Sequence, residues 1–218
     1  MVRIVDPGYE IWTPLDGDYI LKFIEKCARN CYKSEGAITD DSAAKMVKKL
    51  IELGHTAMLE HFNITVKITC DLGCYKDITR HRHVSYAIES TRYCNYFKDK
   101  FGSEITVVKP CHIQEGTEMY KAWYDGVCAI EQQYMKMCAL GAKADQARML
   151  LPHSVKADVV MTANLREWRH VLGLRTAPAA HPTVQQIMKA LLKEFKQHIP
   201  VVFDDIGNDL NTPLQKIS

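Results

Sequence analysis

The segment "FNITVKITC", from Phe62 to Cys70, alternates apolar and polar side chains along its whole length. Its apolar positions are Phe, Ile, Val, Ile and Cys, and the residues between them are Asn, Thr, Lys and Thr. A period of two residues is typical of a β-strand that buries one face. The sequence therefore predicts a half-buried strand here, against which other elements must pack.

The segments that flank this strand have the periodicity of helices. In residues 18–32, Ile20, Ile24 and Cys27 fall on one helical face, and a second amphipathic segment at 40–53 ends before Gly54. Beyond the strand, helices are predicted from residue 71 into Arg80, at residues 115–140, 145–151 and 165–174, and from Pro182 to before Pro200.

Further strands are predicted at residues 2–5 and 105–108, and within "SVKADVVMTANL", which should pass into a helix capped by Asn164. Helices outnumber strands, and the two do not alternate strictly. We therefore expect an α+β fold rather than a doubly wound one, rich in helices, with a central and mostly antiparallel sheet.

Composition limits the class of protein. The 218 residues are 47% hydrophobic, which is enough for one domain over residues 1–218. The net charge of +2 lacks the broad basic field of a nucleic-acid-binding protein, so we expect no nucleic-acid partner. The start, "MVRIVDPGYE", lacks the layout of a signal peptide, and no apolar run reaches about 18 residues, so we expect a cytoplasmic protein with no membrane partner.

Cationic side chains are concentrated in "TRHRHVSYAIESTRYCNY", residues 79–96. Arg80 and Arg82 cannot both point into a protein core without partners, so each requires an anion or solvent. A local salt bridge to Asp77, one helical turn earlier, is the structural alternative. The stretch "ESTR", residues 89–92, could form a turn that presents hydroxyl and backbone N–H groups to a phosphate.

Two other segments carry arginines near the ends of predicted helices. Arg148 lies in the otherwise apolar "ARMLLP", and "LREWRHVLGLR" places Arg166, Arg169 and His170 on one helical face, with Arg175 last. That face either lines a cleft or is solvated. The stretch "GHTAMLEH" lacks the HExxH spacing of a metal site, so we expect no metal.

The pattern "RHRHVSYAIESTRY" resembles the signature of the flavin-dependent thymidylate synthases, the thymidylate synthase complementing protein family. The blocks "GHTAMLEHF", "ARMLLP", "TANLREWRHVLGLR" and "AAHP" resemble further family blocks in the same order. The similarity extends approximately from His55 to Pro182. It implies a homotetramer whose active sites are shared between subunits.

The implied reaction converts deoxyuridylate (dUMP) to thymidylate (dTMP), with 5,10-methylenetetrahydrofolate as carbon donor, FAD as hydride carrier and NADPH as reductant. The residues that match flavin-binding positions are His55, Ala57, Arg80, His81, Arg82, Asn164, Arg166 and His170. The residues that match dUMP-binding positions are Asp77, Arg80, Glu89, Ser90, Thr91, Arg92, Arg148 and Arg175. Arg175 is the expected catalytic residue, because it would stabilise negative charge on the uracil ring.

The chain departs from the family pattern at a few positions. Ala57 stands where a hydroxyl residue is common, Asp77 where Gln or Glu is usual, and Ala87-Ile88 where many members have Asn-Glu, the glutamate here being Glu89. Two other functions remain open: a flavin enzyme that acts on a different nucleotide, and a non-enzymatic nucleotide- or RNA-binding module. Flavin colour in the purified protein would separate the enzyme from the binding module.

Overall fold

The structure is a computed structural model that describes residues 2–94, 96–97 and 102–207. The chain forms two compact units, each made of three segments. Unit 1 comprises residues 1–10, 67–80 and 86–160, and unit 2 comprises residues 11–66, 81–85 and 161–218. The chain therefore passes repeatedly from one unit to the other. The expectation of a single domain over residues 1–218 stays a prediction.

A four-stranded sheet has the order β2-β3-β6-β4. Its strands are β2 Gly8–Ile11, β3 Asn63–Asp71, β6 Lys156–Asn164 and β4 Ser85–Ile88. Thr65 bonds Thr162 through the two hydroxyl oxygens at 2.9 Å, and Thr69 donates to Asp158 at 2.7 Å. Between these two contacts the residue number rises along β3 and falls along β6, so the two strands are antiparallel. The alternation predicted for residues 62–70 is confirmed, because alternate residues from Ile64 to Cys70 are buried.

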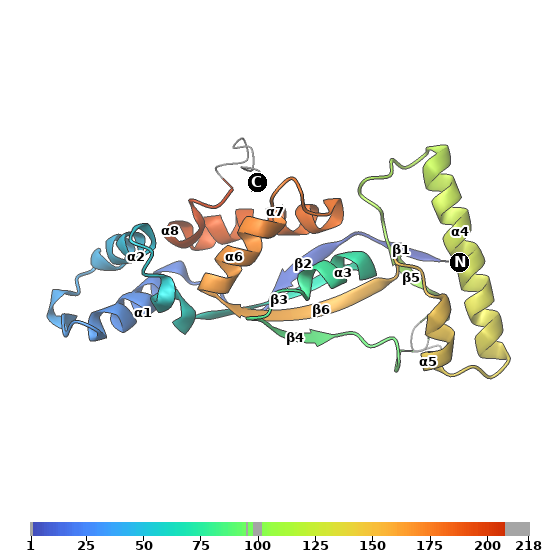
Figure 1. The fold of residues 1–218 in the computed structure, drawn as a ribbon, viewed down its shortest axis with the longest axis horizontal. Coiled ribbons are helices and arrows are strands. Elements are labelled where there is room, and N and C mark those ends of the chain that lie inside the picture. Colours follow the sequence, from blue (N-terminus) through green and yellow to red (C-terminus); the bar gives the residue numbers. More distant parts are fainter. Residues whose placement is uncertain (1, 95, 98–101, 208–218) are drawn as a thin grey trace, which may run out of the picture. The chain divides into compact units, whose positions relative to one another are not determined.

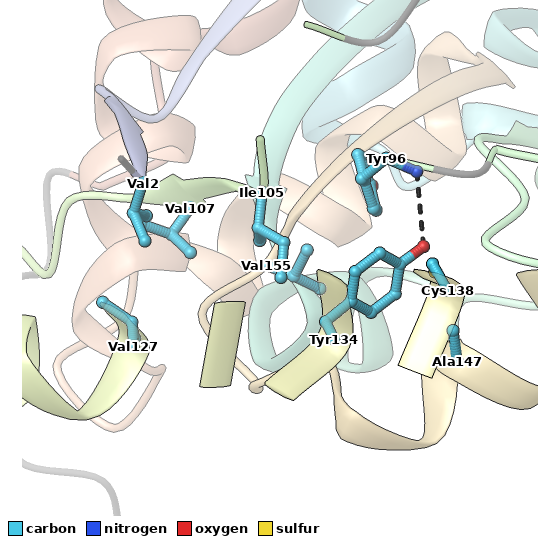
Figure 2. Packing of buried hydrophobic residues seen from close by; sticks show 9 residues of the cluster. All are labelled: Val2, Tyr96, Ile105, Val107, Val127, Tyr134, Cys138, Ala147 and Val155. Carbon is cyan, nitrogen blue, oxygen red and sulfur yellow. Dashed lines mark hydrogen bonds between the residues drawn. The ribbon is translucent and has the colours of Figure 1, made fainter. Parts of the chain in front are cut away.

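Unit 1 has its own core beside a small parallel sheet. Strand β1, Arg3–Val5, pairs with β5, Thr106–Val108, and the long helix α4, Glu118–Ala139, runs beside them (Figure 1). Side chains from these elements, among them Tyr134 of α4, form a buried cluster. Tyr96 belongs to the same cluster. The backbone N–H of Tyr96 donates to the Tyr134 hydroxyl at 3.3 Å (Figure 2). The shorter elements here are α3 Leu72–Ile78, α5 Ala144–Ala147 and a 3-10 turn at Arg148–Leu150.

Unit 2 is built mainly from helices. Helix α1, Gly17–Asn30, packs against α2, Ser42–Glu52, and α6, Leu165–Arg175, packs against α7, Pro182–His198 (Figure 1). Short turns complete the unit: 3-10 helices at Glu35–Ala37 and Thr56–His61, and helix α8 at Pro200–Phe203. No helix in the described ranges has the length and apolar character that a membrane span requires.

The mixture of helices and antiparallel strands confirms the predicted α+β class, whereas two helix boundaries were wrong. Helix α3 ends at Ile78 and does not reach Arg80, because the Thr79 hydroxyl donates to the Tyr75 carbonyl and the Tyr86 hydroxyl donates to the Ile78 carbonyl. The helix predicted at 145–151 is one turn of α-helix followed by a 3-10 turn. Strands β2 and β4 were not predicted.

Candidate active site

Helix α6 is held firmly within unit 2. The Asn164 side chain accepts a hydrogen bond from the backbone N–H of Glu167 at 2.8 Å, which confirms the predicted cap. Trp168 is fully buried, and its indole N–H donates to the carbonyl of Ile64 at 3.0 Å. The cap and this anchor fix the rotation of the helix, and so they fix which side chains face His81.

His81 lies at the centre of a polar cluster. Arg175 Nε donates to His81 Nε2 at 2.9 Å, and a carboxylate oxygen of Glu167 lies 3.6 Å from His81 Nδ1. The rings of His81 and His170 meet edge to face with centroids 5.7 Å apart. The structure thus brings together three residues that the sequence assigned to the flavin and the uracil: His81, His170 and Arg175. Glu167 was not predicted as a site residue.

His81 is neutral at neutral pH. Burial is the main cause that lowers its pKa from 6.5 to about 4, and the charges of Arg175 and His170 lower it further. A neutral imidazole carries one N–H. Because Nε2 accepts the proton of Arg175, the imidazole proton is on Nδ1, the nitrogen that faces Glu167.

His81, Glu167 and His170 offer ligand atoms within 4.8 Å of one another, close enough to share a metal ion. The bond from Arg175 opposes that use. With the lone pair of Nε2 engaged by Arg175, a metal on Nδ1 would require an imidazolate, and the guanidinium would repel the ion. The expectation of no metal stays a prediction that this geometry favours.

A polar cavity of about 460 Å³ lies beside the cluster in unit 2. It is lined by the predicted residues Asn164, Arg166 and His170 together with Glu60, His83 and Glu167. Arg166 donates to Glu60 at 2.5 Å. Sequence analysis missed Glu60 and His83 as site residues, although both lie inside the family-like blocks. Glu60 looks like an ordinary surface carboxylate and His83 like one more histidine of the cationic segment, so neither residue type indicates a cavity.

Arg169 does not line this cavity, contrary to the expectation that it would share a face with Arg166 and His170. Its guanidinium donates to both carboxylate oxygens of Asp205, at 2.7 and 2.6 Å, and to the carbonyl of Val202. This arginine holds the segment after α8 against α6. This contact could not be predicted from helical spacing, because the partner is 36 residues away in the sequence.

Four predicted flavin-binding residues are exposed: His55, Ala57, Arg80 and Arg82. His55 precedes the 3-10 turn that contains Ala57, and the two arginines flank His81. Among the described residues, no salt bridge joins Arg80 or Arg82 to a carboxylate. The alternative of a local bridge from Arg80 to Asp77 stays a prediction. Both cations lie on the surface, where they can meet an anion.

Most of the predicted nucleotide-binding residues lie in unit 1. Ser90 begins a turn after β4, in which its carbonyl accepts from the N–H groups of Tyr93 and Cys94, each at 3.0 Å. Thr91 is half-buried in this turn, and the exposed Arg92 stacks over Tyr93 at 5.7 Å. The predicted "ESTR" turn is thus confirmed. Asp77 is half-buried on α3. Among the described residues, no hydrogen bond or salt bridge connects the exposed Arg148 with this turn.

Glu89 is engaged by a protein cation. Lys156 donates to Glu89 and to Asp158, both at 2.8 Å, and Lys67 lies 3.6 Å from Asp158. Burial alone would raise the pKa of Asp158, but hydrogen bonds from Lys156 and Thr69 outweigh it and lower that pKa. The side chains of Glu89 and Lys156 are 18% and 19% exposed. The negative charge of Glu89 is therefore already balanced within unit 1.

Comparisons with known proteins find relatives of this chain. A flavin-dependent thymidylate synthase from Pyrococcus furiosus is 30% identical over 158 residues, 72% of this chain and 64% of the relative. One from Mycolicibacterium gilvum is 29% identical over 217 residues, 91% of this chain and 84% of the relative. The chain thus spans 64% of the length of the Pyrococcus relative.

Solved structures share the fold. The UMP/dUMP methylase PolB from Streptomyces cacaoi, bound with 5-Br dUMP, is similar with a TM-score of 0.75 and 20% identity, over 93% of this chain and 95% of that one. The flavin-dependent thymidylate synthase ThyX from Helicobacter pylori, complexed with FAD and dUMP, has a TM-score of 0.72 and 21% identity, over 93% and 99%.

The chain also matches a family model over most of its length. Residues 18–201 match the sequence model of the family described as thymidylate synthase complementing protein. This range includes the cationic segment, the cavity of unit 2 and the whole His81 cluster. The chain therefore belongs to the thymidylate synthase complementing protein family.

Proposed function

We propose that this chain is a flavin-dependent thymidylate synthase. It methylates dUMP to dTMP, with 5,10-methylenetetrahydrofolate as carbon donor, FAD as cofactor and NADPH as reductant. The observation that carries the proposal is the hydrogen bond from Arg175 to His81. It joins the arginine assigned to the uracil with a histidine assigned to the flavin, although the two are 94 residues apart in the sequence.

The residues of unit 2 fit the chemistry of FAD. The polar cavity of about 460 Å³ is in the size range of cofactor sites, and it presents the donors of Arg166, His83 and His170. A guanidinium suits the diphosphate, and imidazoles suit polar edges of a planar ring. FAD, when bound, supplies the hydride. The chain would hold it with His55, Ala57, Arg80, His81, Arg82, Asn164, Arg166 and His170.

The residues of unit 1 fit a nucleotide phosphate. The turn that begins at Ser90 combines hydroxyl groups with the exposed cation Arg92, and Arg80 precedes it in the chain. Charge-assisted hydrogen bonds from arginine to phosphate are among the stronger polar contacts in proteins. Because Lys156 neutralises Glu89, that carboxylate does not repel the phosphate. Asp77, Thr91, Arg148 and Arg175 complete the proposed dUMP set.

The proposed assembly is a homotetramer in which each active site takes residues from more than one chain. Arg148, which is exposed, would then serve the site of a neighbouring copy. Light scattering tests the assembly. A monomer that keeps full activity on dilution would contradict it.

The test of the activity is the release of tritium from dUMP labelled at the uracil carbon that is methylated, with and without NADPH. We expect release that requires dUMP, the folate and NADPH together, from protein that absorbs near about 450 nm. Colourless protein that binds dUMP without turnover would point instead to a binding module.

A parallel assay with UMP tests whether the enzyme acts on a different nucleotide. We expect dUMP to be strongly preferred. Equal or faster methylation of UMP would assign the chain to the wider group of nucleotide methylases.

A further inference from the structure

We infer that Glu167 is a positioning residue: it holds His81 in the orientation and tautomer that allow Nε2 to accept from Arg175, and through His81 it fixes the guanidinium. The inference deepens the proposed function. Only its activity test depends on that function being correct. Its structural part stands on the contacts of unit 2.

The placement follows from helix geometry. Glu167, His170 and Arg175 are separated by three and then five residues on α6, which puts them on one stripe of the helix. Both ends of the His81 ring meet this stripe: Nε2 faces Arg175, and Nδ1 faces Glu167. The ring is 6% exposed, so protein groups rather than water decide how it turns.

The tautomer follows from the donors and acceptors. Arginine has N–H groups and no acceptor, so any nitrogen that faces it must offer a lone pair. A carboxylate has only lone pairs, so any nitrogen that faces it is best protonated. At 3.6 Å the contact with Glu167 is longer than a hydrogen bond, and it acts as the attraction between a negative charge and the N–H dipole. Arg175 and Glu167 therefore favour the same tautomer.

Removing Glu167 takes away one of the contacts that restrain the His81 ring. The side chain of Glu167 is 11% exposed, so water would not fully replace the carboxylate. His81 could then rotate, or place its proton on Nε2, where it would meet the N–H of Arg175. Either change would break the bond that orients the guanidinium.

The direct test is nitrogen NMR of the full-length protein with histidine labelled in the ring, in the solid state so that particle size is immaterial. The His81 signals are identified by their loss in His81→Gln. We expect wild-type Nδ1 to be protonated and Nε2 to be unprotonated at neutral pH. A proton on Nε2 in the wild-type protein would overturn the inference.

Variants test the part played by Glu167. Glu167→Gln should keep the wild-type pattern, because the partial negative charge on its amide oxygen still attracts the N–H dipole at Nδ1. Glu167→Ala should show partial protonation at both nitrogens, and Glu167→Asp, whose carboxylate is drawn back, should do the same if the alanine variant does not fold. An unchanged pattern in Glu167→Ala or Glu167→Asp would overturn the inference.

Glu25→Gln is the matched control. Glu25 is a buried glutamate of α1 in the same unit, and it accepts hydrogen bonds from Arg29 and Ser42. Its substitution perturbs a buried carboxylate without touching the His81 cluster. We expect the His81 signals to be unchanged in this variant, and a change there equal to that of Glu167→Ala would overturn the specific role of Glu167.

The activity test separates positioning from direct action. Glu167→Ala should lower turnover at saturating dUMP by up to about a hundredfold, as misplacement of a catalytic group does, with a much smaller change in the KM for dUMP. Glu167→Gln should restore most of the turnover. Equal losses of turnover in both variants, with the wild-type nitrogen pattern kept in Glu167→Gln, would show that the charge acts on the reaction without positioning His81, and would overturn the positioning role. If the wild-type protein forms no dTMP, the proposed function fails, and the nitrogen spectra still decide the role of Glu167.

Discussion

Arg175 and His81 share a hydrogen bond of 2.9 Å in which the guanidinium donates through Nε and the imidazole accepts through Nε2. The bond sets the plane of the guanidinium, because Nε and the two terminal nitrogens are coplanar. Arg175 is also the last residue of α6, where the helix dipole alone would favour a cation. A substitution that keeps the charge and removes the planar group separates these two roles.

Arg175→Lys should fold and keep FAD but make dTMP about a hundredfold more slowly at saturating substrate, because lysine cannot reproduce directed, coplanar donors. The lost bond to His81 should lower the free energy of unfolding by no more than about 1.5 kcal/mol. Tritium release and thermal unfolding measure the two effects. Turnover near that of the wild type would return Arg175 to the role of a helix-end cation.

Arg166 and Arg169 form a matched pair, one turn apart on α6. Arg166→Ala should release FAD with a loss of stability below about 1 kcal/mol, because its bond to Glu60 lies at the surface. Arg169→Ala should keep FAD and lose about 1–3 kcal/mol, because it gives up the bidentate contact with Asp205. Flavin absorbance after gel filtration and urea unfolding of both variants check this. The reverse result would contradict the placement of the cavity.

His81 predicts a fall in stability in mild acid. The unfolded state binds its proton near pH 6.5, whereas burial, Arg175 and His170 lower the folded pKa to about 4, with Glu167 facing the other nitrogen. The unfolded state therefore holds more protons between these two pH values, and the free energy of unfolding should fall by up to about 3 kcal/mol as the pH drops through them. Urea unfolding at several pH values measures the slope.

The control for this pH dependence is His81→Gln, which has no titratable ring. Its free energy of unfolding should change less between pH 6.5 and 4 than that of the wild type. An equal slope in both proteins would assign the pH dependence to other groups.

Lys156 should stabilise unit 1 through two carboxylates at once. Lys156→Met leaves Glu89 and Asp158 without this cation, and the free energy of unfolding should drop by about 1–3 kcal/mol at pH 7. Because the folded pKa of Asp158 lies below 3.8, its contribution is present above that pH and disappears in acid, so the difference between wild type and variant should shrink there. A difference that stays constant with pH would contradict the ion-pair explanation.

Elements with strong periodicity could be predicted from the sequence, and the shortest strands could not. The alternation of residues 62–70 and the helical stripes at α1, α4 and α7 were all correct in type, because each buries one continuous face. Strand β4 lies in the cationic segment, and its residues are exposed or half-buried, so it has no apolar period to detect. Its strand conformation depends on the neighbouring β6, which sequence alone does not bring alongside.

In the candidate site, too, residues with a regular local spacing could be predicted and residues placed by distant segments could not. Arg166, His170 and Arg175 lie on one helix that Asn164 caps, so their spacing and the family motif located them together. Glu167 was not predicted, because only the approach of His81, 86 residues earlier in the sequence, gives it a place in the site. The partner of Arg169 could not be predicted either, since helical spacing does not indicate that Asp205 returns to meet it.

The threading of the chain through its two units limits how this protein can have been assembled in evolution. Unit 1 consists of residues 1–10, 67–80 and 86–160, with segments of unit 2 between and after them. A gene fusion or a single crossover transfers one continuous stretch of sequence, so it would always carry pieces of both units. Neither unit of this chain can therefore be transferred as one continuous stretch of sequence.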